Sequence, residues 1–406
     1  MSLYNARGVS AQKEEVHKAT ASLDKGLYPH AFCKIYADYL GGDAAWVNVM
    51  HADGAGTKSI VAYLYWKETH DASVWKGIAQ DAIVMNLDDL LCTGIYDNLL
   101  FSSTIDRNKQ KIPGEVLEMI VTGTQEFFDS MKLFGINIHY LGGETADVGD
   151  VVRTIAVNGT MTARWPKDKL ITNDRIQPGD VIVGLASAGQ AEYERTYNSG
   201  IASNGLTSAR HDLLSKFYAE QFPESFAPSI SAEVMYAGPY HLMDEVSLYT
   251  GPRNQVPGVV SRDLHPERLT IGQLLLSPTR TYAPVMKALF DHHFDAVHGL
   301  VHCSGGGQTK CLKYLPGEYR IIKDNLFDPP PIFRLIQQAS GADDREMYQV
   351  FNMGHRIEIF TSEEAVPGII NLALGLGIDA RIIGRVEAAE KKELILHAPH
   401  GRVVYP

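Results

Sequence analysis

The segment His51–Lys58 reads His-Ala-Asp-Gly-Ala-Gly-Thr-Lys and combines a carboxylate, an ammonium group and two glycines. Asp53 suits a hard cation such as Mg²⁺ and Lys58 suits a phosphate oxygen, which are the two contacts that a nucleotide triphosphate needs. A surface turn with solvated charges would use the same residues. A P-loop has Gly directly before its Lys, where Thr57 stands, and the dinucleotide fingerprint has a third Gly, where Ser59 stands. We therefore expect any phosphate binding here to use another arrangement.

Three more carboxylates fall in Val74–Leu91, where apolar residues recur at helical spacing. At 3.6 residues per turn, Asp81 and Asp88 share one stripe of this helix and Asp89 lies on its flank. Like charges so placed repel one another unless a cation lies between them or solvent screens them. The helix is thus either a solvated acidic face or part of a cation site.

A second glycine-rich segment, Leu141–Asp147, reads Leu-Gly-Gly-Glu-Thr-Ala-Asp and follows an alternating, strand-like run. We interpret it as a second turn that carries carboxylates. The order of a strand, a glycine-rich turn and a carboxylate therefore occurs twice along the chain, and an acidic helix lies between the two occurrences. Asp53, Asp89 and Glu144 could therefore converge on one metal and nucleotide centre.

The elements that position these residues follow from periodicity and from Gly and Pro. We expect strands over Trp46–Met50, Ile136–Tyr140, Val151–Thr162, Val181–Ala186 and Ala296–Val301, and helices over Ser10–Leu23, Val74–Leu91, Glu115–Phe134, Ser203–Leu214 and Ile271–His292. The polar, turn-rich stretch 163–180 predicts a domain boundary, giving domains over residues 1–165 and 176–406.

One glycine-containing segment of the second half could bind an anion. Ser203-Asn204-Gly205 opens a helix, and a helix N-terminus is a common seat for an anion. His302 precedes Cys303-Ser304 and three glycines. Nearby histidines could suggest a metal site, but Gly299 interrupts the helix that an i, i+4 pair of ligands would need, so we do not interpret them as ligands.

Composition limits the class of partner and the cell compartment. The chain has 406 residues, of which 45% are hydrophobic, and a formal net charge of −11, which argues against nucleic-acid or anionic-membrane partners. The four cysteines lack the spacing of a disulfide framework or a zinc site. No apolar leader or membrane-length apolar run is present. We expect a soluble, cytoplasmic protein.

The ordered motifs resemble the aminoimidazole ribonucleotide synthetase family (phosphoribosylformylglycinamidine cyclo-ligase, AIR synthase). The resemblance covers nearly the whole chain. Besides the segments above, it rests on Val183–Ser187, Pro278-Thr279-Arg280-Thr281-Tyr282, Pro329–Phe333, Glu346-Met347-Tyr348 and Phe351-Asn352-Met353-Gly354.

The resemblance implies an α+β protein of two domains. The N-terminal ATP-binding domain would pair with a second copy to form a dimeric β-barrel core, and the C-terminal domain would be an α/β sandwich. The implied reaction uses ATP and Mg²⁺ to close formylglycinamidine ribonucleotide, a phosphoribosyl substrate, into aminoimidazole ribonucleotide in purine synthesis. An amide oxygen leaves poorly, so it is first phosphorylated, and the amidine nitrogen then displaces phosphate.

The resemblance also implies roles for individual residues. Asp53, Asp89 and Glu144 would hold Mg²⁺, and His302, Lys58 and Asp89 would act in catalysis, with His302 as proton carrier or phosphate contact. The nucleotide and its phosphates would contact a larger set: Asp53, Gly54, Gly56, Thr57, Lys58, Asp81, Gly142, Gly143, Glu144, Thr145, Asn204, Gly305, Gly306 and Asn352. For Asn204 and Asn352, fixing loops is the alternative role.

Several positions depart from the family pattern. Ala202 stands where the family has His before Ser-Asn-Gly, and the loop Gln190–Ile201 before it is longer. Asp88 replaces Asn, Asp147 replaces Glu, and His355-Arg356 occupies positions where small or apolar residues are common. An imidazole that would contact the substrate or act in catalysis is therefore missing, unless the loop or His211 replaces it. These departures alter the substrate half of the site more than the ATP half.

Three functions remain open from the sequence. The first is a divergent cyclo-ligase, the second a sister ATP-dependent kinase or amide-activating enzyme with another substrate, and the third a catalytically silent ATP-binding paralogue. Selenophosphate synthetase does not fit because no Cys adjoins Asp53, and the glutamine-dependent synthetase of the preceding step does not fit because the chain is too short and lacks a glutaminase segment.

Overall fold

The computed structural model describes residues 6–9, 14–248 and 268–406. Its first sheet has five strands in the order β1-β2-β5-β3-β4. All neighbours are antiparallel except β3 and β4, so β2, β3 and β4 run in one direction and end at the same edge. The strands are β1 Ile35–Ala37, β2 Trp46–Gly54, β3 Leu99–Arg107, β4 Ile138–Asp147 and β5 Ile155–Pro166.

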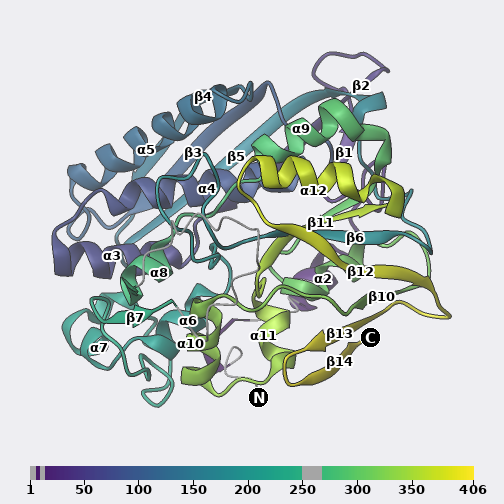
Figure 1. The fold of residues 1–406 in the computed structure, drawn as a ribbon. Helices are drawn as coiled ribbons and strands as arrows, with labels where there is room; N and C mark the ends of the chain where they lie inside the picture. The colour runs from purple at the N-terminus through teal and green to yellow at the C-terminus, as the bar shows by residue number, and fades with distance from the viewer. Residues whose placement is uncertain (1–5, 10–13, 249–267) are drawn as a thin grey trace.

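Helices α4 (Val74–Leu91) and α5 (Gly114–Lys132) cover one face of this sheet (Figure 1). Apolar residues at alternate positions of β5, such as Val157 and Met161, point to these helices and are buried. The opposite face is more exposed, since Met50 and Leu100 keep 66% and 38% of their surface. Helix α3 (Lys58–Thr69) follows β2, and α2 (Glu14–Thr20) precedes β1.

The second sheet has seven strands in the order β14-β13-β10-β12-β6-β11-β9. Every residue of β11 is buried, as expected for a strand inside a sheet that is covered on both faces. Helix α12 packs on β6 and β12, and α9 packs on α12 and on α4, so α9 joins the two halves (Figure 1). The strands are β6 Val181–Ala186, β9 Val297–His302, β10 Tyr319–Lys323, β11 His355–Thr361, β12 Ala380–Ala388, β13 Glu393–Ala398 and β14 Gly401–Tyr405.

The remaining elements surround this sheet. The helices are α6 Leu206–Leu213, α7 Phe217–Gln221, α8 Ile271–Leu276, α9 Ala283–His293, α10 Pro331–Ser340, α11 Asp344–Val350 and α12 Val366–Gly375, and β7 Glu245–Ser247 pairs with β8 Arg268–Thr270. Short 3₁₀ turns are η1 Lys167–Lys169, η2 Pro223–Ser225, η3 Phe294–Ala296, η4 Gly307–Tyr314 and η5 Glu363–Ala365.

The helix predicted over Val74–Leu91 is confirmed with the same ends. The glycine-rich turn expected at Leu141–Asp147 is wrong, because β4 continues through it to Asp147. Gly142 has φ +81°, and the register shifts from the pair Phe101–Tyr140 to the pair Ser103–Gly143. The glycine therefore forms a bulge within the strand.

The single helix expected over Ile271–His292 is also wrong. It breaks after Leu276, and α9 starts at Ala283. Ser277 precedes Pro278 and has an extended ψ of 118°, because a residue before proline avoids the helical region. Of the helix expected over Ser10–Leu23, residues 10–13 lie outside the described part, and α2 occupies 14–20.

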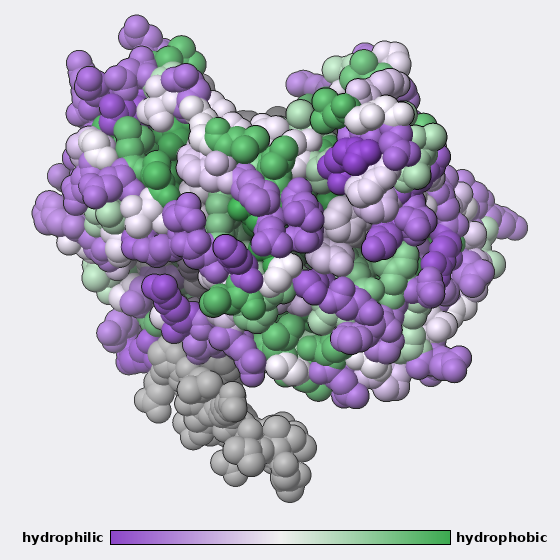
Figure 2. Space-filling model, turned by 90° about the horizontal axis from the view of Figure 1, so that it is seen from above, coloured by the Kyte–Doolittle hydropathy of each residue, from purple (hydrophilic) through white to green (hydrophobic). Residues whose placement is uncertain are grey.

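Strand β5 of the first sheet ends at Pro166 and β6 of the second begins at Val181. The first sheet is open in this single chain, and the expected barrel would need the sheet of a second copy to close it. Seen from above, the surface is hollowed between two raised parts and mixes small polar and apolar patches (Figure 2). In the part of the chain that the structure describes, no helix is long and apolar enough to cross a membrane.

Candidate functional site

Chemistry-bearing side chains from both domains meet at their junction, where β2 and α4 face the second domain. Asp89 of α4 lies at the centre. Its Oδ1 accepts a hydrogen bond from Nδ1 of His302 at 2.6 Å, and its Oδ2 pairs with Nε2 of His51 at 3.1 Å. Burial alone would raise the pKa of Asp89, but the hydrogen bonds from His302 and His51 outweigh it and hold the pKa well below its usual range. Asp89 is therefore a buried carboxylate between two imidazoles.

His302 belongs to β9 and is fully buried. Its Nε2 accepts a hydrogen bond from the guanidinium of Arg356 at 2.6 Å. Because a guanidinium only donates, Nε2 carries no proton and Nδ1 donates to Asp89. Burial and the charge of Arg356 lower the pKa of His302 to about 4, against the effect of Asp89. The structure thus places His302, the expected proton carrier, away from solvent with both ring nitrogens in use.

His51, which the motif analysis did not single out, forms the other end of this chain of contacts. Its Nδ1 lies 3.0 Å from Oδ1 of Asn86. The amide nitrogen of Asn86 donates to three backbone carbonyls, so its oxygen faces His51. Burial lowers the pKa of His51, but the hydrogen bond and charge of Asp89 outweigh it and raise the pKa. Both ring nitrogens face acceptors, which favours the imidazolium. A lone His within a strand gives no spacing signal by which to find it.

Lys58 and Asp81 form a fully buried ion pair, with 2.9 Å between Nζ and Oδ1. Lys58 also donates to the carbonyl of Ser277 at 2.5 Å. Asp81 accepts from the backbone N–H and the hydroxyl of Thr279 at 2.7 and 2.6 Å. Burial lowers the pKa of Lys58, and Asp81 partly opposes this. Lys58, expected on a phosphate, is here held inside the protein, where it fixes the connection between α8 and α9.

Asp88 and Arg356, two positions expected from the sequence resemblance to be unusual, meet in space. Asp88 is fully buried, and its Oδ2 lies 3.8 Å from the guanidinium of Arg356. Its Oδ1 accepts from the hydroxyl of Thr281 at 2.7 Å. Burial raises the pKa of Asp88 to about 7, although Arg356 lowers it. The buried carboxylate of Asp88 and the buried guanidinium of Arg356 thus partly compensate each other's charge. The sequence named both positions but gave no sign that they touch.

The acidic face of α4 is not solvated, since Asp81, Asp88 and Asp89 are all buried. A helix pattern cannot reveal this, because the residues that cover the carboxylates come from the second domain.

The exposed carboxylates Asp53 and Glu144 do not join Asp89. They lie on β2 and β4, which are separated by β5 and β3, so about three strand spacings or roughly 14 Å lie between them. Register places Asp53 beside Gly159 and Glu144 beside Thr104, on opposite faces of the sheet. With both oxygens of Asp89 used by histidines, the three carboxylates do not form one ligand set for Mg²⁺ in this structure.

The group with metal-like spacing among the described residues is Cys303, His355 and Glu358. All three are buried. Lys323 donates to the same oxygen of Glu358 that contacts Cys303 and His355, and to both the backbone and side-chain oxygens of Gln308. An ammonium already neutralises this carboxylate. We therefore interpret the group as a buried ion-pair network and not as a cation site.

Glycine-rich loops of both domains meet at the junction between the two domains. The hydroxyl of Thr57 lies 2.8 Å from that of Thr207. Asn204 is half-buried, and a Cβ placed on Gly305 would lie 3.6 Å from its Nδ2. Lys310 is half-buried and donates to Ser304 at 3.3 Å. This places partly exposed backbone and an ammonium at the junction, which are suited to phosphate oxygens. The motif analysis missed Lys310.

The glycines of the two predicted turns serve different needs. A side chain at Gly54 would lie 2.1 Å from Oδ1 of Asn158, and one at Gly143 would lie 1.9 Å from the carbonyl of Ser103. Strand pairing therefore requires these two glycines with or without a ligand. Gly56 and Gly142 have open space at Cβ, as Gly306 nearly does, so their backbone can be approached. Thr145 is exposed next to Glu144.

Two expected polar contacts are used inside the fold. Asn352 accepts from Ser187 at 2.8 Å and donates to the carbonyl of Gly200 at 2.8 Å, so it fixes loops. His211 is fully buried on α6, and its Nδ1 accepts from the backbone N–H of Tyr236 at 3.1 Å. His211 therefore does not replace the imidazole that Ala202 lacks.

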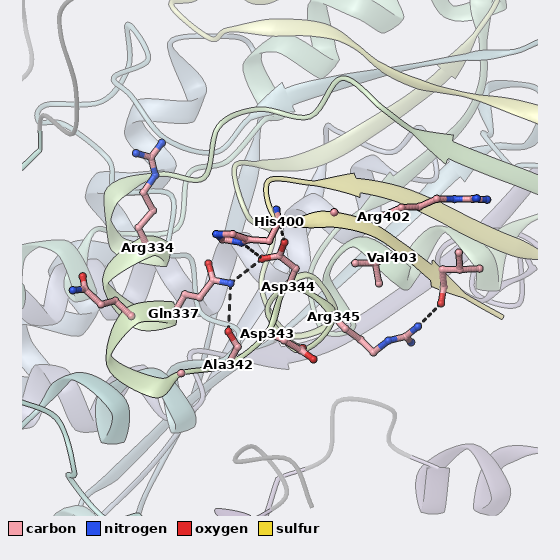
Figure 3. A pocket seen from close by; sticks show the side chains of 13 residues that line it. Arg334, Gln337, Ala342, Asp343, Asp344, Arg345, His400, Arg402 and Val403 are labelled. Atoms are coloured by element: carbon pink, nitrogen blue, oxygen red, sulfur yellow. Dashed lines mark hydrogen bonds and ion pairs between the residues drawn. The ribbon is translucent and has the colours of Figure 1, made fainter.

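A pocket of about 870 Å³ lies elsewhere, between α10, the start of α11 and the β13–β14 hairpin. Asp344 accepts there from Gln337 at 2.8 Å and from the ring and backbone of His400 at 3.0 Å (Figure 3). Arg345 donates to the carbonyl of Val404. Arg334 and Arg402 extend in different directions (Figure 3). The pocket holds none of the predicted site residues.

Comparison with known families matches both parts of the chain. Residues 41–165 match the model "AIR synthase related protein, N-terminal domain", and residues 259–397 match "AIR synthase related protein, C-terminal domain". A relative from Methanocaldococcus jannaschii, named phosphoribosylformylglycinamidine cyclo-ligase, is 32% identical over 339 residues, covering 83% of this chain and 77% of the relative.

Solved structures share the fold at low identity. Thiamine monophosphate kinase from Aquifex aeolicus has a TM-score of 0.51 and 11% identity, over 95% of this chain and 96% of that one. PurL from Thermotoga maritima, solved with ADP, has a TM-score of 0.52 and 13% identity, over 99% of this chain and 50% of that one. At such identities the likeness extends to the fold alone. The two-domain α+β arrangement expected from the sequence is confirmed by these matches.

Proposed function

The chain belongs to the AIR synthase family of ligase enzymes, and from this premise we propose that it closes formylglycinamidine ribonucleotide to aminoimidazole ribonucleotide at the expense of ATP. The similarity to relatives named cyclo-ligase supports the reaction. The observation that carries the proposal for the site is the meeting of Thr57 and Thr207, which joins the glycine-rich loops of both domains.

In the proposed reaction the formyl oxygen attacks the γ-phosphorus of ATP, and ADP leaves. The amidine nitrogen then bonds to the activated carbon, the carbon–oxygen bond breaks, and phosphate departs with that oxygen. The amidine loses protons as the ring forms. Nothing else is consumed, so one ADP and one phosphate accompany each imidazole product.

We assign the phosphates to the junction loops, with Lys310 as cation and with the amides around Gly56, Gly305 and Gly306 as donors. The imidazolium of His51 is the half-exposed member of the His302–Asp89–His51 chain, and we propose it as the positive group and proton donor of the site. Asp89 and His302 then position His51, which revises their expected roles. Lys58 and Asp81 would hold the loop from the inside.

Mg²⁺ would accompany ATP and neutralise its phosphates. Asp53 and Glu144 are exposed carboxylates that suit such an ion, but they and Asp89 do not fit one ion together, so we assign no step to the metal. We also propose a cytoplasmic site of action, in keeping with four free, buried cysteines.

A homodimer is the proposed assembly. Met50, Thr162, Leu100 and His139 form one row across four strands on the open face of the first sheet. Leu141, 62% exposed, lies on the same strand as His139. A second copy of this face would bury this row.

A second candidate is phosphoryl transfer from ATP to a different amide or acid. The observation in its favour is Ala202, which removes an imidazole from the substrate side while His211 stays buried. The fold is shared with a kinase, so it does not decide between the two.

The test is a steady-state assay with formylglycinamidine ribonucleotide and Mg-ATP that follows imidazole product and phosphate together. Equal amounts of both support the cyclo-ligase. ATP binding without product would move the proposal to the second candidate, and absence of ATP binding would favour a silent paralogue.

A further inference from the structure

The loop Gln190–Ile201 is fixed at its base. Both carboxylate oxygens of Glu194 pair with the guanidinium of Arg280, at 3.0 and 2.5 Å, and the side chain of Arg280 is 1% exposed. Glu194 also accepts from Asn198 at 2.9 Å. Tyr193 donates to the carbonyl of Thr281 at 2.5 Å. A buried bidentate pair holds such a loop in one place.

The tip of this loop separates two pockets. Arg195, Thr196, Tyr197 and Pro278 line both of them, and the pockets measure about 560 and 430 Å³. The larger one has the size of a small-molecule site. It lies between the loop tip, α3, the start of α4 and α8.

The larger pocket combines an apolar wall with one group of each charge. Its apolar and aromatic lining is Tyr65, Val74, Tyr197, Leu269 and Leu276, and its charged groups are Arg195 and Asp71.

Neither charged group is neutralised by the other. No hydrogen bond or ion pair links Arg195 to any residue that the structure describes. Asp71 uses Oδ1 to accept from the backbone N–H of Ser73 at 2.9 Å, and its other oxygen has no donor among the described residues. Two opposite charges that line one pocket without pairing leave room for a ligand that contacts both.

We propose that this pocket binds a small zwitterion with an apolar or aromatic side chain, the chemical class of the hydrophobic amino acids. Arg195 receives the carboxylate, Asp71 receives the ammonium group, and Tyr65 and Tyr197 receive the side chain. A phosphate monoester is disfavoured, because its two negative charges would face Asp71. The site is therefore independent of the proposed cyclo-ligase reaction and of its phosphorylated substrate.

The test uses three probes in isothermal titration calorimetry on the full chain: L-phenylalanine, 3-phenylpropionate without the amine, and 2-phenylethylamine without the carboxylate. We expect L-phenylalanine to bind most tightly. Arg195→Gln should lower the affinity for L-phenylalanine and for 3-phenylpropionate about tenfold, since one charge-assisted hydrogen bond to the carboxylate is lost. The affinity for 2-phenylethylamine should not change. Asp71→Asn should lower the affinity for L-phenylalanine and 2-phenylethylamine and leave the affinity for 3-phenylpropionate unchanged.

Arg402→Gln is the matched control, because Arg402 is an exposed arginine of β14 that lines the distant pocket of Figure 3. It should leave all three affinities unchanged. Arg195 is exposed and makes no hydrogen bond or ion pair with a described residue, so Arg195→Gln should unfold at the wild-type temperature and a folding defect will not mimic the result. Failure of all three probes to bind, or an equal loss for all probes in either variant, would overturn the proposal. Loss of cyclo-ligase activity would not bear on it.

Discussion

Asp89 connects two histidines that come from different domains, His51 of the first and His302 of the second. The carboxylate has no solvent to balance its charge, so its stability in the ionised form depends on these two donors. Arg356 then fixes the tautomer of His302 from the far side. At the scale of single residues, the site is thus a chain of charges in which each group sets the protonation of the next.

Asp89→Asn should show this dependence. The amide cannot balance the charge of His51, and it offers one acceptor in place of two, so we expect the free energy of unfolding to fall by about 3 kcal/mol. We also expect turnover to fall more than 100-fold, as is usual when a proton-transferring group is disordered. Chemical denaturation and the steady-state assay measure the two effects.

Asp129→Asn on the exposed face of α5 is the control, with an expected change within about 0.5 kcal/mol. If Asp89→Asn matches the control in both stability and turnover, the chain of charges has no function.

The connection Ser277–Tyr282 is the element that ties the domains together. Its residues bind three buried charged groups of α3 and α4: Lys58 through Ser277, Asp81 through Thr279, and Asp88 through Thr281. A continuous helix could not present these backbone and hydroxyl groups in succession. Pro278 breaks the helix at the point where the contacts are needed.

Thr279→Val tests this element. It removes the hydroxyl that donates to Asp81 at 2.6 Å and leaves a buried carboxylate less satisfied. We expect a loss of about 2 kcal/mol in thermal or urea unfolding.

The exposed Thr196→Val is the control. Equal stability of the two variants would show that the hydrogen bond to Asp81 contributes nothing.

The titration of His211 on helix α6 should make the free energy of unfolding depend on pH. Burial, and then the charges of Arg210 and Arg7, lower the pKa of His211 to about 2. Below a pH of about 6.5 the unfolded chain binds a proton that the folded chain does not, so this group makes stability fall as pH drops. Between pH 8 and pH 5 the loss amounts to about 2 kcal/mol.

His211→Asn keeps an acceptor for the N–H of Tyr236 but does not titrate. Urea unfolding at pH 8 and pH 5 should therefore show a flatter pH dependence for the variant. The same slope for both proteins would mean that His211 is protonated in the folded state.

Sequence reasoning found the positions of the acids on α4 because helical spacing is a local property. It could not find their burial, which depends on β9, β11 and Ser277–Tyr282 folding over them. It named Gly142-Gly143 as a turn, since paired glycines favour turns, but pairing with β3 keeps the segment extended. It missed His51 and Lys310 because neither has a spacing pattern, and only the fold brings them beside the loops.

At the scale of the whole molecule, an exposed sheet face stands opposite the helices. Met50 and Leu100 pair with the same residue, Thr162, so they lie two strands apart in one row. Exposed apolar side chains that gather on one face, here Met50, Leu100 and Leu141, are typical of an interface. It is the surface to which the proposed second copy would bind.

Met50→Asp should weaken the proposed dimer, because it places a charge at one end of that row, where the wild-type side chain is apolar and exposed. Sedimentation at micromolar concentration should show dimers for the wild-type protein and a larger share of monomers for the variant. Leu133→Asp, at a position that is 85% exposed on the helix side, should leave the dimer intact. A monomeric wild-type protein would contradict the assembly.

The cyclo-ligase assignment is tested most directly by following one oxygen atom. Formylglycinamidine ribonucleotide labelled with ¹⁸O in the formyl group is converted with Mg-ATP, and the phosphate is analysed by mass spectrometry. Activation of the amide by phosphorylation predicts one ¹⁸O atom in each phosphate, in step with the imidazole product. Unlabelled phosphate, or phosphate formed without imidazole, would contradict the proposed function.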